Sequence, residues 1–252
     1  MSELLIKLQG VMPSEQVCVK IGEQCGGKVA LAFSCGKDSI AAWLQLNRLG
    51  VAVVPYYCYI VPDLKFINEQ VKYYEDFFET KIHQFPNRSL LRMLSDLTFQ
   101  PPHHVAAIRQ IGFRKINNER FSEAILDKFG MPDGFIGVGC RACDSARRRL
   151  SFIRTGPISH KRRNFFPVWD WTVEKVRVEL FKSKVRIPKD YWMFGRSFDG
   201  LDYRFLEPLS RHYPEDYARI LEWFPFAELE ILRRNSAMKP KTAKTYDHPQ
   251  NR

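Results

Sequence analysis

Short apolar runs alternate along most of the chain with stretches in which apolar residues recur every three to four positions. The runs predict buried strands at residues 29–33, 51–60, 81–85, 135–138 and 165–169. The periodic stretches predict helices at residues 38–49, 66–78, 89–97, 118–129, 144–154 and 172–182. Strands that alternate with helices are joined by right-handed crossovers. The pattern therefore predicts an α/β, Rossmann-like fold with an open, mostly parallel five-stranded sheet and helices on both faces.

The alternation is interrupted at residues 100–104, QPPHH, and the segment 105–115 after them has no clear pattern. Beyond Arg186 we expect loops and two helices only, at residues 214–223 and 226–234. We therefore expect an N-terminal extension (1–27), an α/β domain (28–185), a small helical C-terminal region (186–236) and a flexible basic tail (237–252).

The N-terminus has no basic segment followed by an apolar one, so no signal peptide is predicted. The longest apolar run, residues 51–61, is much shorter than a membrane span and contains a proline. We therefore expect a cytoplasmic protein without a membrane partner. Its six cysteines, at positions 18, 25, 35, 58, 140 and 143, are expected to be reduced.

The formal charge of +11 is concentrated in one block. From Arg141 to Arg163 the chain has eight Lys or Arg against one Asp, a net charge of +7. This block predicts an anionic partner, either a phosphate-bearing ligand or a nucleic acid, to which the basic tail could contribute. The alternative is a solvated helix face.

Polar segments follow three of the predicted strands, at residues 34–39, 59–66 and 139–149. Ligands of open parallel sheets bind at the carboxyl ends of the strands. Because these three segments fall at such ends, we expect them to converge on a single site.

The first of these segments, SCGKDS at residues 34–39, leaves a strand and opens a helix, so its backbone N–H groups are expected to point into a concavity at a positive helix end. Gly36 permits a tight turn, Ser34 and Ser39 add hydroxyl groups, and Lys37 can neutralise phosphate. Asp38 would meet Mg²⁺ or cap the loop. The alternative is an ordinary glycine turn with Asp38 as the helix N-cap, and spacing alone does not separate the two.

The pattern S-x-G-K-D-S between a strand and a helix resembles the PP-motif of the adenine-nucleotide α-hydrolase superfamily, which includes the N-type ATP pyrophosphatases. The resemblance implies a HUP-type fold in which the loop, including Cys35, holds the pyrophosphate part of ATP. It also implies that attack falls on the α-phosphorus. The adenine would lie beside Tyr59, Ile60 and Val61.

A second segment, GCRACDSARR at residues 139–148, resembles the phosphoadenosine phosphosulfate (PAPS) reductase branch, as does FFPVWDWTVEKVRVEL after it. The segments at 56–66 and 194–202 are similar to phage and mobile-element members of that branch. The resemblance places Gly139 in the nucleotide pocket and makes Arg141 and Arg148 clamps for phosphate or sulfate. Asp144 and Ser145 would fix the turn or the arginines.

The sequence departs from that branch in one respect, because no cysteine follows Cys143 and the C-terminal nucleophile for sulfonucleotide reduction is missing. Cys140 and Cys143 form a C-x-x-C pair, which could be half of an iron–sulfur or zinc site, or a redox pair. The alternative, which we favour, is two small residues in an anion-binding turn. We therefore expect no iron–sulfur cluster.

These inferences predict an enzyme that binds ATP with Mg²⁺ and splits it between the α- and β-phosphates, transferring or releasing AMP. Lys37, Asp38 and Arg148 would be catalytic, and Asp38 would meet the Mg²⁺ held by the phosphates. PAPS or another adenine nucleotide is the alternative ligand. A nucleotide-gated, nucleic-acid-binding regulator without turnover is the second hypothesis. A sulfonucleotide reductase that uses Cys140 or Cys143 is the third.

Overall fold

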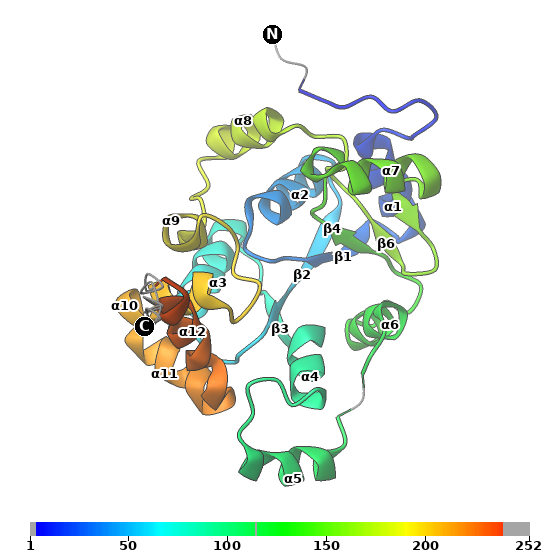
Figure 1. Cartoon of the computed structure of the whole chain (residues 1–252). Coiled ribbons are helices and arrows are strands. Elements are labelled where there is room, and N and C mark those ends of the chain that lie inside the picture. Colours follow the sequence, from blue (N-terminus) through cyan, green and yellow to red (C-terminus); the bar gives the residue numbers. More distant parts are fainter. Residues whose placement is uncertain (1–3, 114, 239–252) are drawn as a thin grey trace, which may run out of the picture.

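The computed structural model describes residues 4–113 and 115–238, and its centre is a six-stranded sheet (Figure 1). The strand order is β3-β2-β1-β4-β6-β5, with every neighbouring pair parallel except β5 and β6. The strands are β1 Lys28–Ala32, β2 Ala52–Tyr59, β3 His83–Pro86, β4 Ile136–Val138, β5 Ile158–Ser159 and β6 Asn164–Phe165. The predicted α/β fold with a mostly parallel sheet is confirmed.

The predicted number of five strands is wrong, because the sheet ends in a short antiparallel hairpin. β5 has two residues and pairs with β6, so its formation depends on its neighbour and leaves no periodic signal in the sequence. The strand predicted at 165–169 is shorter and begins earlier, since Pro167 cannot donate to a ladder.

Each helix predicted before residue 186 is present, with ends displaced by a few residues. They are α2 Lys37–Arg48, α3 Lys65–Phe78, α4 Arg88–Ser95, α6 Asn118–Lys128, α7 Ala146–Thr155 and α8 Val173–Ser183. The helix predicted at 144–154 starts later, because a 3-10 turn, η1 Ala142–Asp144, precedes α7. α5 Pro102–Ile111 occupies the segment without a clear pattern, and its first residue is a proline of the QPPHH break.

Besides α5, three described helices lie outside the predictions: α1 Ser14–Gln24, α9 Lys189–Phe194 and α10 Tyr203–His212. The expectation of two helices beyond residue 186 is therefore wrong. α9 has only six residues, and α10 contains Pro208, which normally argues against a helix. The two predicted helices there are α11 Pro214–Trp223 and α12 Leu229–Met238, joined by the 3-10 turn η2 Pro225–Glu228. Of the predicted tail, residues 239–252 lie outside the described residues.

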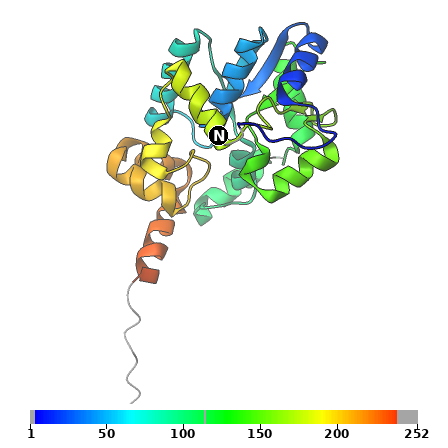
Figure 2. The same ribbon diagram turned by 90° about the horizontal axis from the view of Figure 1, so that it is seen from above.

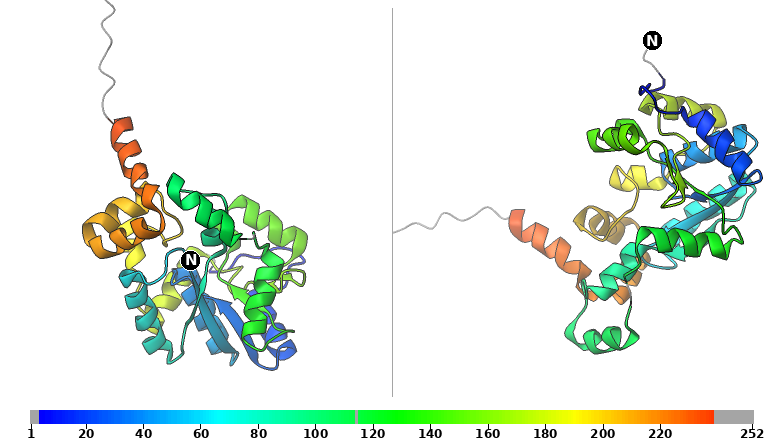
Figure 3. Two further views of the ribbon diagram at one scale, coloured as in Figure 1. Left: turned by 90° about the horizontal axis from the view of Figure 1, so that it is seen from below. Right: turned by 90° about the vertical axis from the view of Figure 1, so that its right-hand side faces the viewer.

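The strand β1 is the centre of the core, and its side chains alternate between two apolar clusters. Val29 and Leu31 belong to the larger cluster with α1, α2, α3 and α8, whereas Ala30 belongs to a smaller one with α6. All three residues are fully buried. Helices therefore pack on both faces of the sheet, as predicted, but α6 covers only part of the second face (Figures 1 and 3).

The C-terminal helices are fixed to α3 by a buried carboxylate. The N-cap residue of α3 has no side chain that caps the helix. Asp216 of α11 instead accepts hydrogen bonds from the amides of Lys65, at 2.6 Å, and Phe66, at 2.9 Å. A carboxylate at a helix N-terminus also suits the helix dipole. This contact joins residues that are 150 positions apart in the sequence and holds the C-terminal region against α3. The last described helix, α12, projects outward (Figure 2).

Among residues 4–113 and 115–238, no helix is long and apolar enough to cross a membrane.

Candidate functional site

The 34–39 loop runs from the end of β1 into the first residues of α2, in the strand–turn–helix arrangement that the sequence predicts. Cys35 adopts a left-handed conformation, with φ of 57°, and its side chain is buried. The Ser34 hydroxyl accepts a hydrogen bond from the Gly36 amide at 3.3 Å. The Ser39 hydroxyl accepts from the Ser34 amide at 3.2 Å and donates to the Gly36 carbonyl at 2.8 Å. The two serines therefore hold the shape of the turn.

The N-terminus of α2 has no side-chain cap. Its N-cap is Gly36, and Asp38 is the second residue of the helix, so the alternative in which Asp38 caps α2 is wrong. Within the part of the chain that the structure describes, the amides of Cys35, Lys37 and Asp38 make no hydrogen bond. Free amides at the positive end of a helix form a binding place for an anion.

Gly139, after β4, lies directly against the first turn of α2. A Cβ atom at this position would be 2.6 Å from the carbonyl carbon and oxygen of Asp38 and 2.7 Å from the amide nitrogen of Ser39. These atoms belong to the backbone and cannot rotate away. Only glycine therefore permits the loop after β4 to approach the helix this closely.

Five charged side chains form a continuous row beside the loop, alternating in sign: Lys37, Asp38, Arg141, Asp144 and Arg148. Lys37 Nζ is 3.0 Å from Asp38 Oδ2, and Arg141 Nε is 2.9 Å from Asp38 Oδ1. Asp144 receives Arg141 Nη2 at 2.9 Å and Arg148 Nη1 at 2.6 Å. Three cations face two carboxylates, so the row has a surplus positive charge.

The cation at the centre of the row, Arg141, is almost completely buried, with 3% of its side chain exposed. Its Nε approaches Asp38 as an ion pair without the alignment of a hydrogen bond, and its buried Nη1 has no partner among the described residues. Buried polar groups normally have partners. Arg141 therefore contacts two carboxylates and has a buried Nη1 without a partner among the described residues, and its predicted contact with phosphate stays a prediction.

The outer arginine of the row, Arg148, is half exposed and lies on α7. Its amide donates to the Ser145 hydroxyl at 3.2 Å, so Ser145 is the N-cap of α7. Asp144 additionally accepts from the Arg141 amide at 2.9 Å. Asp144 and Ser145 thus order the turn that carries both arginines.

The loop is also contacted by the C-terminal region. The hydroxyl of Tyr191, on α9, is 3.3 Å from Lys37 Nζ, whose ammonium lies 5.5 Å from the centre of the Tyr191 ring. Burial alone would lower the pKa of Lys37, but Asp38 and Tyr191 together raise it. A Cβ atom on Gly36 would lie 2.6 Å from Ser197 Oγ. The segment after α9 therefore covers the loop.

A buried carboxylate positions this covering segment. Asp190 accepts from the Phe198 amide at 2.7 Å and from Gln70 Nε2 at 2.6 Å. Burial raises the pKa of Asp190. We predicted no role for any residue of this segment from the sequence. The only signal there is the motif FGRSFDGLD at 194–202, whose resemblance to phage and mobile-element proteins is noted above.

Two neighbouring cavities open beside the loop, above the carboxyl halves of β1 and β2. The one next to the loop has a volume of about 390 Å³ and is lined by Ser34, Ile60 and the covering segment. Tyr59 and Val61, the other residues expected near the adenine, do not line it. The cavities share Ala32, Tyr56, Cys58, Asn87 and Ser89.

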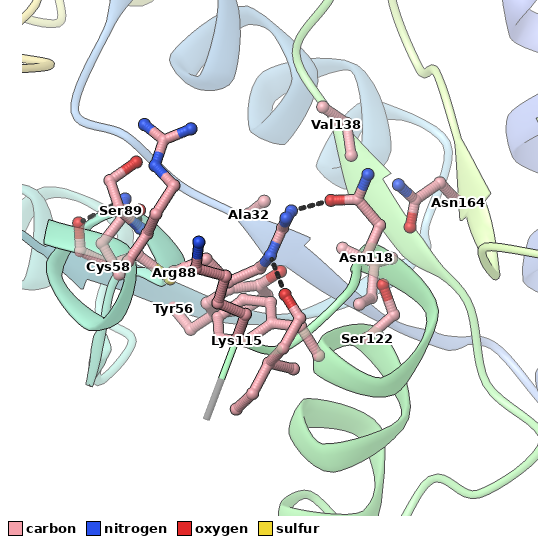
Figure 4. A pocket seen from close by; sticks show the side chains of 15 residues that line it. Ala32, Tyr56, Cys58, Arg88, Ser89, Lys115, Asn118, Ser122, Val138 and Asn164 are labelled. Carbon is pink, nitrogen blue, oxygen red and sulfur yellow. Dashed lines mark hydrogen bonds between the residues drawn. The ribbon is translucent and has the colours of Figure 1, made fainter. Parts of the chain in front are cut away.

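The second cavity, of about 520 Å³, lies where α6 leaves the sheet uncovered (Figure 4). Ala32, Tyr56 and Val138 form its floor, and polar side chains of Asn118, Ser122 and Asn164 face it (Figure 4). Three cationic residues, Arg88, Arg92 and Lys115, also line it. The site thus offers an uncapped helix end beside a partly apolar cavity with cationic walls.

The C-x-x-C pair lies at the edge of the site. Cys140 and Cys143 are both partly buried, and burial raises the pKa of each thiol. Cys143 Sγ donates to the Trp171 carbonyl at 3.4 Å. Over the described residues, no group of three or more His, Cys, Asp or Glu side chains is arranged to hold a metal ion. The expectation that the protein holds no iron–sulfur cluster stays a prediction.

No protein-family model matches this chain, and no curated protein matches it. Solved structures resemble it at a low level, among them the following two. One is an NH3-dependent NAD synthetase from Campylobacter jejuni subsp. jejuni NCTC 11168 in complex with the nitrate ion, with 12% identity over 90% of this chain and 95% of that chain and a TM-score of 0.42. The other is the U34-tRNA thiolase NcsA from Methanococcus maripaludis with its 4Fe–4S cluster, with 13% identity over 90% of this chain and 88% of that chain and a TM-score of 0.42. Neither similarity carries an argument about the chemistry of this chain.

Proposed function

We propose that this protein binds ATP with Mg²⁺ and cleaves it between the α- and β-phosphates, as an ATP pyrophosphatase or adenylyl-transferring enzyme. The observation that carries the proposal is the uncapped end of α2, where three free amides lie next to a charge row with a surplus cation. An anion with several negative charges satisfies both features at once.

The phosphates bind in the 34–39 loop, and the nucleoside occupies the adjoining cavities. The amides of Cys35, Lys37 and Asp38 are the donors to the phosphate oxygens, because no described residue accepts a hydrogen bond from them. The floor formed by Ala32 and Tyr56 accommodates the apolar parts of the ligand. Ile60 is the predicted neighbour of the adenine that lines the cavity.

Asp38 is the carboxylate of the loop that can meet Mg²⁺, which prefers oxygen ligands and keeps several of its own waters. Its side chain is 20% exposed, and its carboxylate forms ion pairs with Lys37 and Arg141. When bound, Mg²⁺ would supply charge neutralisation at the phosphates. Lys37 would exchange part of its contact with Asp38 for a phosphate oxygen.

In the proposed reaction a nucleophile of the second substrate forms a bond to the α-phosphorus and releases its proton to solvent. The bond from this phosphorus to the bridging oxygen breaks, and pyrophosphate leaves with the electron pair. The helix end and Lys37 stabilise the negative charge on pyrophosphate. Arg148, half exposed at the end of the charge row, would stabilise charge on the acceptor side.

A sulfonucleotide reductase is disfavoured by the state of the two candidate thiols. Thiolates, not thiols, are nucleophilic. Burial raises the pKa of Cys140 and Cys143, which opposes formation of a thiolate at either residue. A regulator that binds nucleotide without turnover would use the same loop, and product analysis separates it from an enzyme.

The test measures ATP binding and products with two matched variants. Lys37→Gln removes the cation of the loop, and Lys72→Gln removes one charge from an exposed face of α3. For the parent and Lys72→Gln we expect a rise in Tm with ATP and Mg²⁺, and AMP with pyrophosphate as products. For Lys37→Gln we expect affinity for ATP to fall about tenfold or more, which is about 1.4 kcal/mol.

Three outcomes would contradict the proposal. If the parent does not bind ATP, the assignment of the loop is wrong. If the products are ADP and phosphate, the cleavage position is wrong. Equal ATP affinity in both variants would show that Lys37 does not contact the phosphates.

A further inference from the structure

A third cavity, of about 470 Å³, lies between α7 and the β5–β6 hairpin and shares Arg148 with the charge row of the proposed ATP site. Its wall carries three cations, Arg148, Lys161 and Arg162, against a single carboxylate, Glu119. The remaining wall combines hydroxyl groups with two aromatic rings and a thiol: Ser151, Thr155, Ser159, Phe152, Phe166 and Cys140. This combination of cations, hydroxyl donors and aromatic rings suits a ligand that has both a phosphate and an apolar ring.

The cations of this cavity are poorly neutralised. Within residues 4–113 and 115–238, Lys161 has no ion pair. Arg162 Nε is 3.8 Å from Glu119 Oε1, a long contact between partly exposed groups that contributes little. Arg148 shares its carboxylate, Asp144, with Arg141. The wall therefore has positive charge available for an external anion.

The positive surface continues along α7 beyond the cavity. Arg147 and Arg154 are exposed and lie seven residues apart, so they share one side of the helix at a separation of about 10 Å along its axis. Neither forms an ion pair with any described residue. This side adjoins the stripe of Arg148, Ser151 and Thr155 that faces the cavity. A ligand with one phosphate would occupy the cavity alone, whereas a longer polyanion would also use Arg147 and Arg154.

The third cavity borders the proposed ATP site in two places. Cys140 lines it and directly follows Gly139, which contacts the first turn of α2. Asn164 lines both this cavity and the 520 Å³ cavity. A ligand bound here would therefore lie beside the end of α2 that is assigned to the phosphates of ATP.

We propose that this cavity receives one nucleotide of a single-stranded nucleic acid whose backbone continues along α7. Its cations bind the phosphates, and the partly buried ring of Phe166, which packs against the core residue Phe152, contacts the base, which is available for stacking only when it is unpaired. The inference rests on the proposed function, because it makes the nucleic acid the second substrate. A nucleophilic atom of this nucleotide attacks the α-phosphorus and releases a proton to solvent, while pyrophosphate leaves with the electron pair.

The experiment measures binding of fluorescent 12-residue oligonucleotides, single-stranded DNA, single-stranded RNA and duplex DNA, by anisotropy at several salt concentrations. Lys161→Ala with Arg162→Ala alters the cavity, and Arg147→Ala with Arg154→Ala alters the flanking stripe. Arg177→Ala with Lys182→Ala removes the same charge from exposed positions on α8 and serves as the control. ATP binding and thermal unfolding are measured for all variants.

We expect single strands to bind more tightly than the duplex. The slope of log K against log salt is negative, and each phosphate contact to a single strand contributes about 0.7 to its magnitude. Loss of two phosphate contacts should therefore reduce the magnitude of the slope by about 1.4 in each test variant. The control should retain the parental slope. ATP affinity should be unchanged in all three variants, because none alters the 34–39 loop.

Equal oligonucleotide binding by the test and control variants would overturn the inference, as would a preference for duplex. Binding of inorganic phosphate alone, with no gain from a longer strand, would also overturn it in favour of a small phosphorylated acceptor. These results would leave the proposed function intact if ATP is still cleaved to AMP and pyrophosphate. Conversely, salt-dependent oligonucleotide binding without ATP binding would defeat the proposed function while retaining the nucleic-acid site.

Discussion

Gly139→Ala is the substitution that most directly tests the architecture of the site. The added Cβ would lie 2.6 Å from the carbonyl carbon and oxygen of Asp38, whereas ordinary contacts begin at 3.4 Å. The backbone after β4 and the first turn of α2 must therefore separate by about 0.8 Å, the difference of these two distances. Overpacking of this kind typically costs about 1–3 kcal/mol.

For a chain of this length, each kcal/mol lowers Tm by about 2–4 °C, so we expect a decrease of about 2–12 °C. The effect on turnover should be larger. A misplacement of about 1 Å in a catalytic site can reduce the rate about 100-fold. The assays are thermal unfolding and release of pyrophosphate from ATP.

The control is Gly200→Ala, which adds the same methyl group where the nearest atoms are 3.8 Å away. It should resemble the parent in both assays. If Gly139→Ala matches the parent in stability and in ATP cleavage, the loop after β4 does not lie against α2 as described. If it unfolds earlier but cleaves ATP normally, the contact is structural and the catalytic argument is refuted.

Two further predictions concern buried carboxylates. Asp216→Ala removes the cap that α11 provides to α3, and we expect the free energy of unfolding, measured by denaturant titration, to fall by about 1–2 kcal/mol. The control is Glu215→Ala, a change at an exposed neighbour. Equal effects of the two substitutions would contradict the capping role. Burial raises the pKa of Asp170 in the folded protein, so ionisation of this carboxyl opposes folding. The neutral carboxyl contributes fully to the free energy of unfolding below the ordinary pKa of 3.8, and this contribution is lost as pH rises through the raised pKa. Asp170→Asn keeps an acceptor for the Ser14 amide, and we expect it to gain stability over the parent at pH 7 but not at pH 3; a pH-independent difference would refute this.

Local sequence patterns were sufficient for the α/β class, the central strands and most helices. β1 could be predicted because a strand that is buried on both faces leaves an apolar run in the sequence. α2 could be predicted because a helix that is buried on one face leaves apolar residues every three to four positions. The 34–39 loop could be placed between them because its residues are consecutive. Its predicted role with ATP, by contrast, still depends on the binding experiments above.

Only the tertiary structure decided which side chains meet at the site and how deeply they are buried. Arg141 has the same sequence signal as Arg148, yet one is buried between two carboxylates and the other is half exposed, because the turn between them enters the core. Tyr191 and Ser197 reach the 34–39 loop from more than 150 residues away, and no local pattern predicts that contact. The cap of α3 by Asp216 is equally non-local. Periodicity reports how each segment faces the core, whereas the pairing of distant segments depends on packing of the whole chain.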